Sequence, residues 1–274
     1  MTHRFSDLKD IPVVILAGGF GTRLREQTEF IPKPMVPIGI RPILWHLMKI
    51  YSHYEYRRFI ICLGYKGEII KDYFLHYRFR NSDFTIKLGN HEDINIHNLH
   101  GEEAWQVTLA DTGLKAMTGA RIKKIEKYID TDYFLLTYGD GVANIEIKKL
   151  VEFHLSHGKI ATVTGVKPPS RFGELLTEGS CVIEFGEKPQ VGNSVINGGF
   201  FVFNRGIFSY LTEDDQCILE REPLERVAKD GHLMVYHHTG FWQCMDTLRD
   251  MNQLNEYWES GNALWKVWKE EAPL

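Results

Sequence analysis

The chain has 274 residues, 43% of them hydrophobic and 25% charged, which is the composition of a globular protein with a sizeable core. Its formal net charge of −4 argues against a surface that binds nucleic acid or an anionic membrane, and leaves room only for a local basic pocket. No apolar run reaches the ~18 residues of a membrane-spanning helix, and the polar segment 1–10 lacks the apolar core of a secretory signal.

The cysteines predict a reducing compartment. None of them belongs to a CxxC pair, and several lie among apolar neighbours. We therefore expect a cytoplasmic protein with reduced, structural thiols and without a zinc site built from cysteines alone. The cysteines are Cys62, Cys181, Cys217 and Cys244.

Strands and helices are predicted to alternate from the N-terminus to residue 166. The first strong segment, 12–16, is short, β-branched and apolar throughout, as a strand buried on both faces would be. Such alternation implies parallel strands joined by crossover helices. Segment 81–110 has an irregular pattern, with short strands expected at 85–88 and 105–109. The other strands expected here are 59–63, 133–138 and 159–166, and the helices are 42–54, 68–77, 121–127 and 145–156.

Beyond residue 166 the pattern changes to strand segments and separate helices. The chain as a whole predicts a single α/β domain over 1–274, in which the alternating part is followed by further strands and helices. Aromatic side chains in the last segment indicate packing or subunit contact rather than catalysis. The strands expected are 181–185, 198–203 and 233–237, the helices are 223–230 and 248–268, and the aromatic residues are Tyr257, Trp258, Trp265 and Trp268.

A glycine-rich segment, 18–23, follows the first predicted strand at once. Ligands of open parallel sheets bind beyond the carboxyl ends of the strands, and glycines let backbone N–H groups approach a phosphate closely. Arg23 adds a fixed charge with a bidentate donor fork. The segment is not a dinucleotide fingerprint, because Leu24 stands where that motif needs glycine, and the chain lacks a Walker A run. A tight turn without a ligand stays open as the alternative.

Lys33 is the second candidate for a phosphate contact. Pro32 and Pro34 stiffen the backbone on both sides of it. A lysine on a stiff segment suits a charge that must be positioned, whereas the ordinary alternative is a solvated loop lysine.

Two aspartates are candidate metal ligands. Asp140 lies between two glycines directly after the strand predicted at 133–138, and Asp246 lies in an apolar and aromatic segment where a carboxylate needs a partner. Mg²⁺ takes one or two protein carboxylates and completes its shell with water and phosphate oxygens. The alternatives are a turn aspartate for Asp140 and the N-cap of the following helix for Asp246.

Two segments after predicted strands are candidate sugar contacts. In 187–189, Glu187 could accept hydrogen bonds from sugar hydroxyls while Lys188 pairs with a phosphate, and Asn197 could present its amide to a sugar. Plain turns at both places are the alternative. The triplet 111–113 is that of an aspartic protease, but such chemistry needs two triplets and the second Asp-Thr lacks its glycine.

These segments together resemble the sugar-nucleotide nucleotidylyltransferases. The N-terminal signature, 16–24 with 32–34, indicates only the superfamily, whereas the later blocks resemble the members that make CDP-glucose for deoxysugar synthesis. The chain departs from the family pattern at Ala116, Ala120 and Cys244. The matching later blocks are 42–46, 63–67, 138–141, 185–189, 197–201, 240–243 and 245–250.

The resemblance implies a fold, substrates, a cofactor and residue roles. The fold would be a Rossmann-like, mixed and mainly parallel sheet flanked by helices, with a small β appendage and C-terminal helices. CTP and a sugar 1-phosphate would be the substrates, Mg²⁺ the cofactor, and other copies of the chain the partners, without nucleic acid or membrane. Part 11–166 would bind the nucleotide and part 167–274 the sugar. The catalytic residues would be Arg23 and Lys33, the metal ligands Asp140 and Asp246, the substrate contacts Arg121, Glu187, Lys188 and Asn197, and the nucleotide contacts Leu16, Ala17, Gly18, Gly19, Phe20, Gly21, Thr22, Arg23, Thr118, Gly119 and Gly139.

The expected reaction is an in-line displacement, in which a phosphate oxygen of the sugar 1-phosphate attacks the α-phosphorus of CTP. That oxygen is already anionic, so no strong base is needed, and catalysis consists of positioning and charge neutralisation. Two alternatives stay open. One is a thymidylyl- or uridylyltransferase of the same fold. The other is a non-catalytic nucleotide-sugar sensor, which would not need to keep Lys33 and both aspartates.

Overall fold

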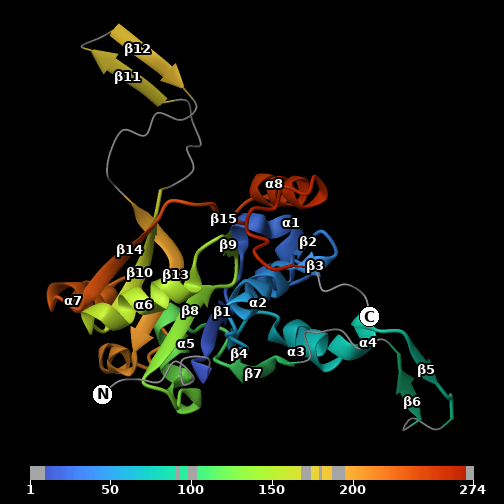
Figure 1. Ribbon diagram of the computed structural model, residues 1–274. Coiled ribbons are helices and arrows are strands. Elements are labelled where there is room, and N and C mark those ends of the chain that lie inside the picture. The colour runs from blue at the N-terminus through green and yellow to red at the C-terminus, as the bar shows by residue number, and fades with distance from the viewer. Residues whose placement is uncertain are drawn as a thin grey trace.

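A seven-stranded sheet forms the centre of the molecule (Figure 1). The computed structural model describes residues 10–89, 93–97, 104–167, 174–178, 181–186 and 195–269, and within 174–186 the backbone alone. The strand order is β14-β10-β13-β8-β1-β4-β7. These strands are β1 (Val13–Ala17), β4 (Arg58–Leu63), β7 (Gln106–Asp111), β8 (Tyr133–Tyr138), β10 (Ala161–Val166), β13 (Ile196–Asn204) and β14 (Leu233–His238).

Strand β13 interrupts an otherwise parallel sheet. It pairs antiparallel with both β8 and β10, whereas the other neighbours in the sheet pair in parallel. Strands β13 and β14 come from the part of the chain beyond residue 166, and they extend the sheet that the earlier strands begin. The predicted fold class, a mixed and mainly parallel α/β sheet flanked by helices, is confirmed.

Helices cover both faces of the sheet, so β1 is buried on both sides. Val13 and Ile15 belong to one hydrophobic cluster, and Val14 and Leu16 to the other. This explains why the sequence of β1 is apolar throughout instead of alternating. The first cluster includes side chains of α2 (Ile43–His53), α3 (Gly67–Leu75), α6 (Ile147–His157) and α8 (Leu248–Glu259), and the second those of α5 (Thr118–Lys124) and α7 (Glu222–Lys229).

Four two-stranded sheets complete the strands of the described residues. The pair β9–β15 matters most for function, because it joins the segment after β8 to the segment before α8. The strands of these sheets are β2 (Pro37–Ile38) with β3 (Arg41–Pro42), β5 (Phe84–Ile86) with β6 (Ile94–Ile96), β9 (Gly141–Ala143) with β15 (Trp242–Cys244), and β11 (Glu174–Glu178) with β12 (Cys181–Gly186). The short helices are α1 (Arg25–Thr28) and α4 (Tyr77–Asn81).

One prediction about local structure is confirmed, and another needs correction. The strand expected at 105–109 is β7, which forms an edge strand of the central sheet, parallel to β4. The helix predicted over 248–268 ends at Glu259, so its last part is wrong. Gly261 adopts a left-handed φ of 74°, and the Asn262 N–H donates back to the Tyr257 carbonyl, which stops the helix.

The C-terminal aromatic residues pack against α2, as predicted. Trp265 is fully buried, and its Nε1 donates to Nδ1 of His46 across 3.4 Å, while His46 Nε2 lies 3.0 Å from the Ile38 carbonyl. Burial lowers the pKa of His46 to about 4, so the ring is neutral and can accept this hydrogen bond. Among the described helices, none is long and apolar enough to cross a membrane.

Candidate active site

A cleft of about 520 Å³ opens at the carboxyl ends of β1 and β8. It contains most of the predicted site residues, because loops that leave neighbouring parallel strands share one edge of the sheet. The lining residues are Leu16, Ala17, Gly18, Gly19, Gly21, Thr22, Arg23, Lys33, Pro34, Ala116, Met117, Thr118, Arg121, Tyr138, Gly139, Asp140, Asn197, Trp242, Cys244 and Asp246.

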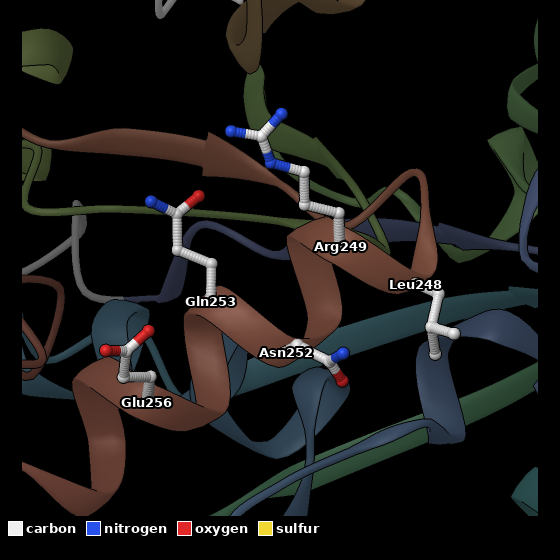
Figure 2. Close-up of a pocket in the computed structure, with 5 residues that line it drawn as sticks. All are labelled: Leu248, Arg249, Asn252, Gln253 and Glu256. Carbon is white, nitrogen blue, oxygen red and sulfur yellow. The ribbon is translucent and has the colours of Figure 1, made fainter.

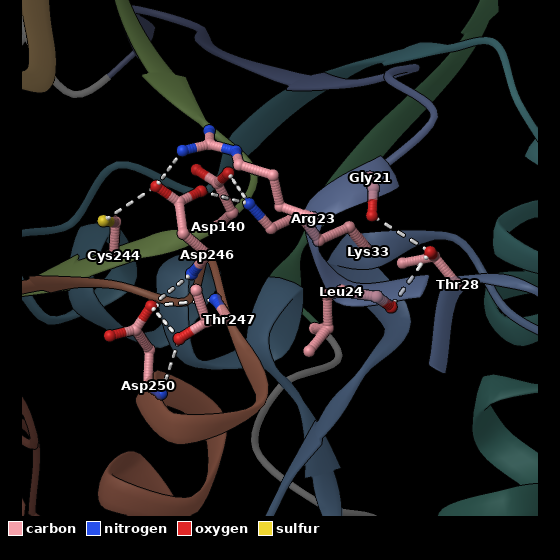
Figure 3. A network of polar contacts seen from close by, with 10 residues as sticks. All are labelled: Gly21, Arg23, Leu24, Thr28, Lys33, Asp140, Cys244, Asp246, Thr247 and Asp250. Atoms are coloured by element: carbon pink, nitrogen blue, oxygen red, sulfur yellow. Dashed lines mark hydrogen bonds and ion pairs between the residues drawn. The ribbon is translucent and has the colours of Figure 1, made fainter. Parts of the chain in front are cut away.

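The turn after β1 depends on glycine at position 21. Gly21 has a left-handed φ of 62°, and a Cβ there would lie 2.7 Å from Cγ2 of Thr28. The Thr28 hydroxyl lies 3.0 Å from the carbonyl oxygen of Gly21 and 3.0 Å from that of Leu24 (Figure 3). Thr28 therefore stabilises the conformation of the turn, and Gly18 and Gly19 line the cleft.

Arg121 lies beneath this loop and ties three strand ends together. Its side chain is buried, and its guanidinium donates to the carbonyl oxygens of Leu63 (2.9 Å) and Gly18 (3.0 Å) and to the hydroxyl of Thr112 (2.7 Å). Burial lowers its pKa, yet an arginine keeps its charge. Arg121 also lines the cleft, and its predicted role as a substrate contact stays a prediction.

The charged side chains converge on one point of the cleft (Figure 3). The Lys33 ammonium lies 2.5 Å from Oδ2 of Asp140 and 2.8 Å from Oδ1 of Asp246. Arg23 Nη1 donates to the other oxygen of Asp246 at 2.8 Å, with its side chain 70% exposed. Lys33 itself is 9% exposed and follows Pro32 in a 3₁₀ turn, so its stem is held while its charge reaches the carboxylates. The solvated-loop alternative for Lys33 is therefore wrong.

Ion pairing offsets the burial of this cluster. Burial acts to lower the pKa of Lys33, but the two carboxylates, Asp140 above all, outweigh it and raise that pKa. Burial acts in the opposite sense on Asp246, and the hydrogen bond and charge of Lys33, with Arg23 nearby, hold its pKa below the ordinary value. Lys33 and Asp246 are therefore both charged at neutral pH.

The ladder between β9 and β15 brings the two aspartates together. Gly141 pairs with Cys244, and the Met245 N–H donates to the Asp140 carbonyl at 2.8 Å. The N-cap alternative for Asp246 is wrong, because Thr247 caps α8 in a capping box with Asp250. The Asp246 side chain is thereby left for the cleft.

Other predicted residues occupy several parts of the site. Thr118 and Asn197 line the cleft, and Phe20 is 49% exposed beside Tyr65. At Gly119 and Gly139 a Cβ would lie within 3 Å of Cys217 and of the Leu16 carbonyl respectively, so close packing requires glycine at both. Glu187 and Lys188 lie outside the described residues.

Sequence reasoning missed several lining residues. Tyr138 and Trp242 project into the cleft from the ends of strands, and Cys244 lies 3.5 Å from Asp246 through its Sγ. Burial, followed by the two nearby aspartates, raises the pKa of the Cys244 thiol to about 12. For Tyr138, its place in the sequence could have indicated a site residue, because it directly precedes Gly139 and Asp140 at the end of a strand.

A second hollow, of about 550 Å³, lies along the outer face of α8 (Figure 2). Its side chains belong to successive turns of one helix and bring no pair of carboxylates to a cation. It therefore does not share the chemistry of the cleft. The residues that line it are Leu248, Arg249, Asn252, Gln253 and Glu256.

Residues 12–262 match the nucleotidyl transferase family, and the chain belongs to that family. Within it, the chain is 49% identical to a glucose-1-phosphate cytidylyltransferase of Salmonella typhi over 93% of this chain and 99% of that protein. It is 45% identical to a probable glucose-1-phosphate cytidylyltransferase of Bacillus subtilis, with the same coverage of both chains.

Solved structures agree with this assignment. HddC from Yersinia pseudotuberculosis superposes with a TM-score of 0.64 at 25% identity, covering 90% of this chain and 99% of that one. A UDP-glucose pyrophosphorylase with bound UDP-glucose superposes with a TM-score of 0.65 at 16% identity, covering 92% and 99%, and this likeness concerns the fold alone.

Replacing Gly18 by alanine should destabilise the protein, because the new Cβ would lie 2.2 Å from the Arg121 guanidinium. Gly19→Ala is the matched control, since a Cβ there meets nothing within 4 Å. Urea unfolding of the ligand-free protein should show a loss of ~2 kcal/mol for Gly18→Ala and a change below ~0.5 kcal/mol for Gly19→Ala. Equal stability of the two variants would contradict the close contact of Gly18 with Arg121.

Proposed function

We propose that this protein transfers the cytidylyl group of CTP to α-D-glucose 1-phosphate, giving CDP-glucose and pyrophosphate. The observation that carries the proposal is the meeting of Lys33, Asp140 and Asp246 beside the glycine-rich loop, in a chain 49% identical to a glucose-1-phosphate cytidylyltransferase. The cleft contains two carboxylates and two cationic side chains beside the backbone N–H groups of the glycine-rich loop. Such a cleft suits a triphosphate with its metal ion better than an uncharged ligand.

The reaction needs no general base. An anionic phosphate oxygen of glucose 1-phosphate attacks the α-phosphorus of CTP, a new P–O bond forms, and the bond from the α-phosphorus to the bridging oxygen of pyrophosphate breaks. The chain must hold the two anions in line and neutralise the charge that develops. Arg23 and Lys33 suit that task, since Arg23 is exposed enough to turn and Lys33 is fixed at its stem.

The remaining residues divide between the two substrates in this proposal. Segment 16–23, with Thr118, Gly119 and Gly139, binds the nucleotide. Arg121, Glu187, Lys188 and Asn197 bind the sugar phosphate. The position of Asn197 in the same cleft as the loop supports the second assignment, as does the indole of Trp242 beside it, which offers an apolar face to a sugar ring.

We further propose that Asp140 and Asp246 hold Mg²⁺. The Lys33 ammonium already bridges the two carboxylates, so they converge tightly enough to share one cation. Oxygen ligands of this kind suit Mg²⁺, which leaves its other positions to water and phosphate oxygens. Bound Mg²⁺ would neutralise phosphate charge.

The proposal includes a cytoplasmic homo-oligomer. Three cysteines, Cys62, Cys217 and Cys244, are free thiols, which supports a reducing compartment. The β5–β6 hairpin carries Phe84 and Ile86 at 44% and 38% exposure, and such apolar side chains support contact with a second copy.

A panel of CTP, UTP, dTTP and GTP with glucose 1-phosphate tests the function through release of pyrophosphate. We expect kcat/KM for CTP to exceed that for UTP by ~10² or more, because a site that hydrogen-bonds one base leaves polar groups unpaired with another. Preference for UTP or dTTP would assign the chain to another branch of the family. Binding of CTP without pyrophosphate release from any sugar phosphate would favour the sensor alternative.

Replacing Lys33 by alanine should lower kcat by ~10² or more, the scale of losing one transition-state charge contact. Lys148→Ala is the control, because that lysine forms an exposed ion pair with Glu55 and does not line the cleft. Steady-state kinetics at saturating substrates measures the effect. Turnover near that of the wild type would remove Lys33 from the catalytic residues.

Divalent cation binding tests the aspartates without turnover. In the nucleotide-free protein, Asp140→Asn or Asp246→Asn should weaken Mn²⁺ binding at least roughly tenfold, whereas Lys33→Met should strengthen it, because the ammonium competes for the same oxygens. Asp132→Asn, an exposed aspartate, is the control. Electron paramagnetic resonance of free Mn²⁺ measures the affinity. Unchanged affinity in either aspartate variant would exclude that residue from the metal site.

A further inference from the structure

A hydrogen-bonded chain of four side chains joins two walls of the cleft. Asn197 Nδ2 donates to the Tyr138 hydroxyl at 3.1 Å, and that hydroxyl donates to Oε1 of Glu220 at 2.5 Å. The Thr118 hydroxyl donates to Oε2 of the same carboxylate at 2.6 Å. Asn197, Tyr138 and Thr118 line the cleft, whereas Glu220 is an exposed residue of the loop before α7 and is not among the lining residues. Glu220 has no role in the reaction described above.

The carboxylate sets the direction of the hydrogen bonds from Tyr138 and Thr118, and the Gly199 N–H orients the Asn197 amide in agreement with them. A carboxylate can only accept hydrogen bonds, so the Tyr138 hydroxyl donates its single hydrogen to Glu220. The Tyr138 oxygen must then act as the acceptor in its other hydrogen bond, for which Asn197 is the donor. The Asn197 carbonyl oxygen then faces the other way, where it accepts the Gly199 N–H at 2.8 Å. The Asn197 amide is thereby locked in one of its two flips, with one N–H left over for a ligand.

Packing keeps the tyrosine in place for this role. The Tyr138 ring lies against Gly199, where a Cβ would come within 2.6 Å of the ring and where φ is 79°. On the other side, the Leu219 N–H donates to the Thr118 hydroxyl oxygen at 2.9 Å, which anchors the end of the chain to the backbone.

We propose that Glu220 is a positioning residue for the sugar substrate. By accepting from Tyr138, it holds Asn197 with an amide N–H directed to the cleft, and this N–H donates to an oxygen of the sugar. The inference rests on the proposed function for the identity of the substrate. It adds that the donor pattern of the sugar subsite depends on a carboxyl group that does not touch the sugar.

Kinetics of four variants test this role. Glu220→Ala and Tyr138→Phe should each raise KM for glucose 1-phosphate by ~10-fold, the effect of about one hydrogen bond, with a much smaller change in kcat. Glu220→Gln should stay close to wild type, because its carbonyl oxygen can accept from Tyr138 while its amide donates to the Thr118 oxygen. Glu225→Gln, on an exposed turn of α7, is the control.

A double variant separates positioning from general loss of structure. If Glu220 acts through Asn197, the pair Asn197→Ala/Glu220→Ala should have the same KM for glucose 1-phosphate as Asn197→Ala alone. Additive effects would overturn the proposal, and so would a Glu220→Gln variant as impaired as Glu220→Ala, because the charge and not the acceptor would then matter. If Glu220→Ala fails to fold, Tyr138→Phe makes the same test with Glu220 intact. Absence of CDP-glucose formation by the wild type would instead refute the proposed function itself.

Discussion

The contact of the Lys33 ammonium with Asp140 and Asp246 is the interaction on which the functional site depends. These two carboxylates come from distant parts of the chain, and without a cation between them they would repel each other in a partly buried cleft. The same geometry that pairs them with lysine suits them to share a divalent cation with phosphate oxygens. In the proposed reaction, Asp140 and Asp246 would hold the divalent cation, which would neutralise phosphate charge, and Lys33 would be able to pair with the phosphates instead.

Arg121 plays a comparable part below the loop. It is a buried cation whose partners are carbonyl and hydroxyl oxygens, drawn from the ends of β1 and β4 and from the segment after β7. The Gly18 and Leu63 carbonyl oxygens also accept the N–H groups of Tyr65 and Thr112, so the guanidinium joins hydrogen-bonded strand ends and adds a charged donor to each. The glycine-rich loop thus rests on a charged support instead of on apolar packing, and Gly18 is needed because a side chain there would collide with it.

Family membership and site geometry together account for most of the function. A match over residues 12–262 and 49% identity to a cytidylyltransferase support the reaction, while the cleft explains how the chain could perform it without a catalytic histidine or cysteine. The departures from the family pattern have ordinary structural settings. Ala116 lines the cleft as a buried small residue, Ala120 is buried in α5, and Cys244 faces Asp246 with its thiol protonated.

The sequence by itself determined the main strands, the glycine-rich loop and the candidate residues, because these depend on local patterns such as apolar runs and glycines with open backbone. It could not show that Asp246, and not Thr247, faces the cleft, nor that helix α8 stops at Glu259. It also gave no reason to notice Glu220. These features depend on contacts between segments far apart in the chain, such as the β9–β15 ladder and the bond from Tyr138 to Glu220, and only the tertiary structure decides which of these segments meet.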